Sequence, residues 1–231
     1  MCGRFTLSYS LKELQNAFPD VEFNFNIEYA SQYNIAPTQE IPVIREDVNG
    51  DLRADLFTWG LIPSWAKDKS IGPRLINARS DTVAEKPAFR GAFKLRRCLI
   101  PADGFFEWVV IEGTKTKLPI YFFKKSRDVF CFAGLWENWR SPKGEEVNSA
   151  TIITTEPNEL VNRFHSRMPV ILPREAYRKW LTPGTKNLSE LHTLLKPYPA
   201  AEMDCYPVSP LANSAKNDGP EVIAPLKQSA M

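Results

Sequence analysis

The sequence predicts a single α+β domain in which a central β-sheet carries short peripheral helices. Runs of Val, Ile, Phe and Thr of strand length recur along most of the chain, and 19 prolines interrupt it. Helical spacing is confined to a few short stretches. The chain contains neither an internal repeat nor a linker long enough to divide it, so residues 1–231 are expected to form one domain.

Composition excludes several classes of protein. The net charge of +2 is too small for a general polyanion binder, so any contact with nucleic acid must come from a local patch. Charged residues interrupt the N-terminal stretch and no apolar run reaches transmembrane length, which predicts a cytoplasmic protein without membrane contact. The 4 cysteines lie far apart and there are 2 histidines, so we expect no disulfide framework, no metal site and no cofactor.

The first predicted element is a short helix. Ser10 and Glu13 form a capping-box pattern, and the apolar residues that follow at helical spacing predict a helix over about residues 10–18. Residues 22–36 alternate between aromatic and polar types and end before Pro37, which holds the preceding residue extended. We interpret this segment as a loop of fixed conformation.

A hairpin and a loop are predicted next. Strands are expected over 41–45 and 52–59, because the Asn49-Gly50 pair between them is a strong hairpin turn. Residues 59–65 are too rich in Gly and Pro for a regular element, so we predict a loop that carries a second large aromatic side chain, Trp65.

A basic run follows this loop. Asp81 can cap a short helix, and the cations after it occur without an acid among them: Lys86, Arg90, Lys94, Arg96 and Arg97. The first three are spaced by four and share one face if the segment is helical. The simplest interpretation of such a run is a solvated surface.

The second half of the chain is predicted to supply the central sheet. Strands are expected at 98–101, 105–111, 118–123, 129–135, 149–155 and 204–209. Glu107 lies between Phe106 and Trp108, so it can face either solvent or a pocket. Residues 157–164 are predicted to form a short helix that precedes His165.

The two clearest amphipathic patterns predict helices over 173–181 and 188–195. His192 lies on the second of these helices. Because its neighbours are polar, it is interpreted as a surface residue.

The second residue, Cys2, is the candidate reactive residue of the sequence. Aminopeptidases remove an initiator methionine when a small residue follows, so Cys2 can carry both a free α-amine and a thiol. These groups ordinarily titrate near ~8 and ~8.5, within reach of cellular pH. With an aldehyde, the amine can form an imine that the thiol closes to a thiazolidine, a ring that an internal cysteine cannot make. The alternative interpretation is a small buried hydrophobe on a first strand.

Six motifs, in order, resemble the SOS response-associated peptidase (SRAP) family. They are residues 1–5 (MCGRF), 33–37 (YNIAP), 59–63 (WGLIP), 75–79 (LINAR), 97–108 (RCLIPADGFFEW) and 165–169 (HSRMP). The resemblance covers nearly the whole chain. It implies an α+β domain around a curved or barrel-like, mainly antiparallel sheet, which crosslinks itself covalently to abasic sites in single-stranded DNA. The implied protein is a monomer that acts at the nucleoid of a prokaryotic cytoplasm.

The resemblance also implies the site residues. Cys2 is the nucleophile, and Asn77, Glu107 and His165 line its pocket. Glu107 is suited to proton removal and His165 to protonation of the departing sugar oxygen. Asn77 can orient the amine or the sugar without adding charge.

The implied DNA contacts lie outside this group. Arg79 and Arg167 are expected to bind phosphates, as is Arg4, because a guanidinium fork suits phosphate oxygens. Trp65 and Pro37 are expected to stack on bases or wedge between them. The basic run is then a candidate outer track for DNA.

Three alternatives stay open from the sequence. An N-terminal-nucleophile glutaminase also begins Met-Cys-Gly, and residues 49–52 faintly resemble one of its loops. A DNA-binding module that recognises modified bases without a covalent bond is the second alternative. Proteolysis is the third, and the substrate it implies here is the protein's own Met1.

Overall fold

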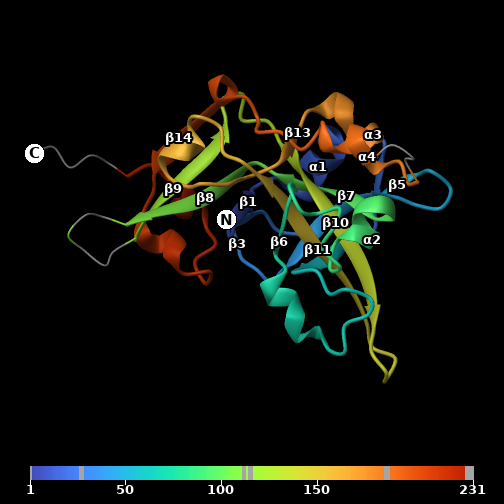
Figure 1. The fold of residues 1–231 in the computed structure, drawn as a ribbon. Helices are drawn as coiled ribbons and strands as arrows, with labels where there is room; N and C mark the ends of the chain where they lie inside the picture. The colour runs from blue at the N-terminus through green and yellow to red at the C-terminus, as the bar shows by residue number, and fades with distance from the viewer. Residues whose placement is uncertain (1, 26–28, 111–112, 114–116, 185–187, 227–231) are drawn as a thin grey trace, which may run out of the picture.

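The computed structural model describes residues 2–25, 29–110, 113, 117–184 and 188–226. Met1, whose removal the sequence analysis requires, lies outside the described residues. Strands are the main regular structure of the described chain, and the helices are short and lie at the edges of the sheets (Figure 1). The predicted fold class is therefore confirmed.

Five of the described strands close into a barrel. In order around the barrel they are β5 (Leu52–Trp59), β4 (Glu40–Glu46), β7 (Arg97–Ala102), β10 (Phe130–Arg140) and β11 (Glu146–Thr155). These neighbours pair antiparallel. The ring closes where β11 pairs parallel with β5, with Ser149 opposite Thr58. Barrel closure leaves no open edge between these strands.

Four shorter strands extend the barrel. They are β2 (Val21–Phe23), β6 (Asn77–Arg79), β12 (Met168–Pro169) and β13 (Ile171–Leu172). β6 runs parallel to β11, and β12 pairs antiparallel with the same strand. Thr154 of β11 is opposite both Arg79 of β6 and Pro169 of β12, so two segments far apart in sequence meet at one residue.

A second sheet carries the N-terminus. Its strand order is β14 (Met203–Pro207), β9 (Lys117–Lys124), β8 (Gly104–Val110), β1 (Phe5–Leu7) and β3 (Gln32–Ile35). Phe5 of β1 is fully buried, with its ring centroid 5.1 Å from that of Trp59 and 5.7 Å from that of Phe132. This aromatic packing fixes the first strand against the barrel and so fixes the position of the residues before it.

The helices are α1 (Leu11–Ala17), α2 (Arg90–Leu95), α3 (Tyr177–Leu181) and α4 (Leu188–His192). Short 3-10 helices occur at Lys69–Arg74, Val161–Arg163, Arg174–Ala176, Ala200–Glu202, Pro210–Asn213 and Pro220–Ile223. The predicted capping box of α1 is confirmed, because the Ser10 side chain accepts from the Glu13 backbone and Glu13 accepts from the Ser10 backbone. In the part of the chain that the structure describes, no helix has the length and apolarity to cross a membrane.

Two local predictions are wrong for the same reason. The expected loop over 22–36 contains the end of β2 and all of β3, and the latter pairs with β1 through Phe5 and Ile35. The expected helix over 157–164 contains only the 3-10 turn at 161–163. In both segments, contacts with distant strands outweigh the weak preferences of the local sequence.

Candidate active site

Cys2 is held inside the protein by its backbone. The side chain is 0% exposed, and its Sγ donates to the carbonyl oxygen of Arg4 over 3.9 Å. Asn77 Nδ2 donates to the carbonyl oxygen of Cys2 over 2.7 Å. Burial, together with the charge of Glu107, raises the pKa of the Cys2 thiol well above its ordinary value. The thiol therefore keeps its proton at neutral pH until a reaction removes it.

Glu107 is the buried carboxyl nearest to this chemistry. It lies on β8 and is 4% exposed. The sequence allowed its side chain to face either solvent or a pocket, and in the structure it faces the pocket. Burial raises the pKa of Glu107, and the positive charge of His165 opposes that rise. The raised pKa makes Glu107 a stronger base than an ordinary carboxylate, which suits it to proton transfer.

His165 follows the 3-10 turn and is oriented by its own backbone. The Arg167 N–H donates to Nδ1 over 3.0 Å, which places the proton of a neutral ring on Nε2. The carbonyl oxygen of Arg167 lies 3.1 Å from the same Nδ1, so a protonated ring has an acceptor there. The Arg167 backbone thus holds Nδ1 and orients the His165 ring in the pocket.

These residues meet at a pocket of about 730 Å³. Its lining comprises Gly3, Arg4, Glu107, Trp108, Lys117, His165 and Asn213. Cys2 and Asn77 do not line it themselves; Cys2 directly precedes the lining residue Gly3 in the chain, and a hydrogen bond joins Asn77 to Cys2. The structure therefore brings all four predicted catalytic residues to one place, although they come from four separate segments.

Arg4 holds the wall of this pocket together. Its Nη1 donates to Asn34 Oδ1 over 2.6 Å and to the carbonyl oxygen of Ala212 over 2.9 Å. Its guanidinium carbon lies 5.7 Å from the centre of the Trp108 ring. Arg4 thus joins β3 and the C-terminal segment to the N-terminus, a structural role in addition to the predicted phosphate contact.

Three lining residues were missed from the sequence. Trp108 lies inside the RCLIPADGFFEW motif, and its indole N–H donates to Asn213 Oδ1 over 2.7 Å. Lys117 begins β9, and its backbone oxygen accepts from Asn213 Nδ2 over 3.4 Å. Trp108 could have been found from its place beside Glu107. Lys117 and Asn213 carry no local signal, because only tertiary contacts bring them to the pocket.

Arg79 and Arg167, the predicted phosphate ligands, lie together beside β11. Both approach Asp81, which forms ion pairs of 2.5 Å with Arg79 and 3.8 Å with Arg167. The sequence predicted that Asp81 could cap a short helix. Turns and not a helix follow Asp81, so its carboxylate pairs with these two arginines instead.

The two predicted stacking residues lie elsewhere on the surface. Pro37 is partly exposed in the turn between β3 and β4. Trp65 is 60% exposed and lines a separate small pocket of about 200 Å³ with Arg90 and Pro87. None of the residues lining that pocket lines the one at Glu107 and His165.

The basic run is only partly a surface track. Arg97 is 2% exposed, and its guanidinium donates to the backbone oxygens of Phe93, Lys94, Trp180 and Thr182. Arg96 pairs with the buried Glu137 over 2.7 Å. Lys86, Arg90 and Lys94 remain exposed. The basic run was predicted to offer five cations at the surface. This is wrong for Arg97, because its guanidinium is buried and donates to backbone oxygens at the ends of α2 and α3.

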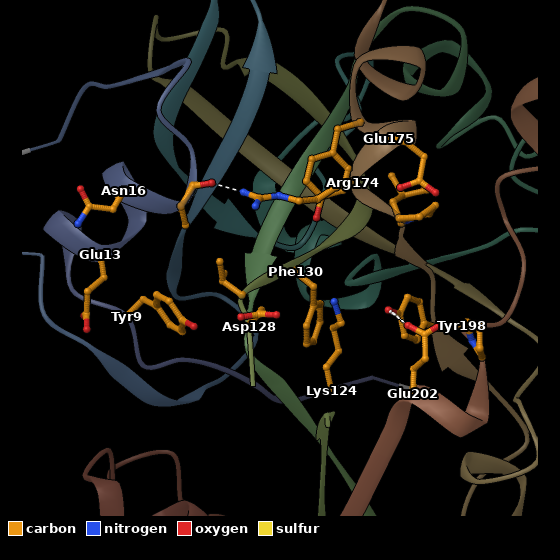
Figure 2. A pocket seen from close by; sticks show the side chains of 16 residues that line it. Tyr9, Glu13, Asn16, Lys124, Asp128, Phe130, Arg174, Glu175, Tyr198 and Glu202 are labelled. Atoms are coloured by element: carbon orange, nitrogen blue, oxygen red, sulfur yellow. Dashed lines mark hydrogen bonds between the residues drawn. The ribbon is translucent and has the colours of Figure 1, made fainter. Parts of the chain in front are cut away.

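A larger cavity of about 770 Å³ lies at another place (Figure 2). Glu13, Asp128, Glu175 and Glu202 contribute carboxylates to its lining, and Tyr198 donates to Glu202 over 2.6 Å. Arg174 reaches across to the carbonyl oxygen of Ala17. No predicted site residue lines this cavity, so its volume does not identify the reactive site. Among the described residues, no group of three metal-ligating side chains occurs.

Known proteins of similar sequence are named abasic site processing proteins. The protein is 46% identical over 223 residues to the abasic site processing protein YoqW of Bacillus subtilis, an alignment that covers 96% of this chain and 99% of that one. It is 32% identical over 234 residues to the abasic site processing protein HMCES of Rattus norvegicus, which covers 86% of this chain and 66% of that one.

Solved structures have the same fold. A crystal structure of a Bacteroides thetaiotaomicron protein superposes with a TM-score of 0.88 at 28% identity and covers 98% of this chain and 100% of that one. A Bordetella bronchiseptica protein gives a TM-score of 0.74 at 26% identity, with 90% and 100% covered. The family model described as SOS response associated peptidase (SRAP) matches residues 1–215. This chain therefore belongs to the SRAP family.

Proposed function

We propose that this protein captures abasic sites in single-stranded DNA by forming a covalent bond through Cys2. The observation that carries the proposal is the 2.7 Å hydrogen bond from Asn77 to the Cys2 backbone, which holds the N-terminal segment beside Glu107 and His165. The relatives named as abasic site processing proteins support the same substrate. An abasic deoxyribose opens to an aldehyde at C1′, the group that an N-terminal cysteine traps.

The reaction requires removal of Met1, by the protein itself or by an aminopeptidase. The freed α-amine of Cys2 adds to C1′, and loss of one water gives a Schiff base. The thiol sulfur then bonds to C1′ while its proton passes to the nitrogen, which closes the thiazolidine. Holding the amine, thiol and aldehyde together replaces a collision of separate molecules with a step inside one complex.

Glu107 and His165 divide the proton transfers. The raised pKa of Glu107 suits it to take a proton from the ammonium and to relay the thiol proton. His165 lines the same pocket and can protonate the sugar oxygen that leaves. A thiol with a raised pKa stays neutral until the Schiff base forms, so the amine reacts first.

Asn77 orients the nucleophile. Its Nδ2 is used by the Cys2 carbonyl, whereas its Oδ1 is buried and has no hydrogen-bond partner among the described residues. A buried acceptor without a partner is unfavourable in the free protein. It gains a partner if it accepts from the α-amine or from a sugar hydroxyl, which would align the reacting atoms.

The DNA contacts lie around this centre. Arg79 and Arg167 are proposed to bind backbone phosphates, with Arg4 at the pocket wall. Exposed Trp65 and partly exposed Pro37 are proposed to stack on unpaired bases or wedge between them, which favours single strands over duplex. The proposed acting species is a monomer in the cytoplasm, at the nucleoid.

The test is a denaturing gel of purified protein mixed with single-stranded DNA that holds one abasic site. The proposal predicts a slower-migrating band with the mature protein, and no stable band with Cys2→Ala or with a residue inserted before Cys2. Cys2→Ala keeps the amine, so borohydride should still trap a Schiff base. Mass spectrometry of the product reports Met1 removal and the loss of one water. Absence of any adduct with the mature protein would leave only non-covalent binding.

A further inference from the structure

Arg79 and Arg167 are partly neutralised by a carboxylate of the same chain. Arg79 makes a two-pronged contact with Asp81, from Nε to Oδ1 over 3.1 Å and from Nη2 to Oδ2 over 2.5 Å. Arg167 Nη1 lies 3.8 Å from the same Oδ2. The hydrogen bond from Arg79 lowers the pKa of Asp81, so the carboxylate is charged at neutral pH.

The barrel positions this triad. Arg79 ends β6 opposite Thr154, and the Ser80 N–H donates to the carbonyl oxygen of Thr154 over 2.8 Å. Arg167 Nη2 donates to the same carbonyl oxygen over 2.6 Å. Asp81 lies two residues beyond Arg79, where the chain turns, so it faces both guanidinium groups from one side.

A carboxylate and a phosphate compete for the same guanidinium donors. Both anions accept two parallel N–H bonds from an arginine fork, and Asp81 already occupies Nε and Nη2 of Arg79. We propose that Asp81 is an intramolecular competitor of the DNA phosphate and weakens the hold on intact strands, so that durable retention depends on the covalent bond. The inference rests on the proposed function, because it assumes that the strand passes over Arg79 and Arg167.

Exposure argues against the opposite role, in which Asp81 would organise the arginines for DNA. The Arg167 side chain is 16% exposed and is already held by the Thr154 backbone, so it does not need Asp81 to keep its position. The Arg79 side chain is 59% exposed and that of Asp81 is 48% exposed. A solvent-exposed ion pair contributes little to stability, so a phosphate can displace it at small cost.

The experiment compares Asp81→Asn with Asp20→Asn, which removes the same charge from an exposed aspartate on a different segment. Fluorescence anisotropy measures the Kd of intact single-stranded oligothymidine over a series of salt concentrations. We expect Asp81→Asn to bind about fivefold tighter at low salt and to steepen the slope of log K against log salt by about 0.7. Asp20→Asn should bind within about twofold of the parent protein, as expected for a remote screened charge.

Two further measurements complete the test. Adding Arg79→Met to Asp81→Asn should abolish the gain, because the freed donor is then absent. The rate of adduct formation at saturating abasic DNA should stay unchanged in Asp20→Asn. Equal or weaker binding by Asp81→Asn, at an unchanged Tm, overturns the inference. Because the binding assay uses intact DNA, a failure of adduct formation would overturn the proposed function without altering this result.

Discussion

Asn77 Nδ2 donates a 2.7 Å hydrogen bond to the carbonyl oxygen of Cys2, across a separation of 75 residues in the sequence. Asn77 begins β6, which the parallel pairing with β11 fixes to the barrel. The bond therefore ties the N-terminal residues to a strand that is paired with the barrel. We infer that the position of the reactive amine depends on this side chain.

The first prediction follows from this bond. Asn77→Ala should slow adduct formation on the order of a hundredfold, because misplacement of one of three reacting groups removes much of the benefit of holding them together. The measurement is a single-turnover time course at saturating abasic DNA. Asn148→Ala, which removes an exposed amide on β11 that accepts a hydrogen bond from Asn138, is the control. An unchanged rate in Asn77→Ala would remove it from the site.

The second prediction concerns the pH dependence of Glu107. Burial raises its pKa, so the folded protein binds the proton more tightly than the unfolded chain does. The stability that this bound proton contributes is therefore fully present below the pKa of Glu107 in the unfolded chain. It is lost as pH rises through the pKa of Glu107 in the folded protein. Glu107→Gln has no such proton to lose, so its Tm should fall less than the parent's over this range.

The same variant should lose activity. Removing a general base typically slows a reaction about 10²-fold or more, and the rising limb of the rate against pH should disappear with it. Gel time courses at several pH values measure this limb. A Glu107→Gln profile that parallels the parent's would show that another group accepts the proton.

The third prediction separates the two histidines. His165→Ala removes the proposed acid, so formation and its reverse should both slow by about 10² or more. The adduct should then appear late but persist longer after transfer to competitor DNA. His192→Ala is the control, compared at saturating DNA, because His192 packs on Phe93 with ring centroids 5.2 Å apart and lines a different pocket, with Asp81 and Arg167. Equal kinetics for the two variants would contradict the assignment.

The fourth prediction separates a structural arginine from an exposed one. Arg97→Met should destabilise the fold by about 3 kcal/mol, because buried carbonyl oxygens at the ends of α2 and α3 lose their donor. Urea unfolding measures this loss. Arg90→Met, at an exposed position, should leave stability unchanged within about 0.5 kcal/mol. A stability loss of similar size in both variants would argue against the structural role of Arg97.

The fifth prediction concerns Trp65. Stacking of one base on an aromatic ring contributes about 1–3 kcal/mol, so Trp65→Ala should raise the Kd for single strands on the order of tenfold. The rate at saturating DNA should be unchanged, because Trp65 does not line the Glu107 pocket. Anisotropy gives the Kd, and a gel gives the rate. A large loss of rate at saturation would place Trp65 in the reaction itself.

The cap and turn motifs that span only a few residues predicted their elements correctly. The Ser10 and Glu13 pair predicted the start of α1, and Asn49-Gly50 predicted the turn between β4 and β5. The predicted strand 52–59 matches β5 in full. These features depend on backbone groups only a few residues apart, so short stretches of sequence contain the information that determines them.

The basic run shows where such reasoning stops. Arg96 and Arg97 are adjacent in the sequence and equally charged, yet one pairs with Glu137 and the other is enclosed by backbone oxygens of α2 and α3. Charge patterning alone cannot separate them, because the acceptors lie on other elements. For the same reason the sequence did not predict the ion pair of Asp81 with Arg167, which lies on a distant segment.

The sequence by itself determined the α+β class through its local patterns and the family through the order of the six motifs, and from that resemblance it predicted Cys2 as the reactive residue and the four candidate catalytic positions. Only the tertiary structure decided how they meet. The parallel pairing of β11 with β5 closes the barrel, and contacts from Arg4 to Ala212 bring Asn213 to the pocket wall. Such contacts join segments that share no local signal, and their stability comes from burying distant surfaces against one another.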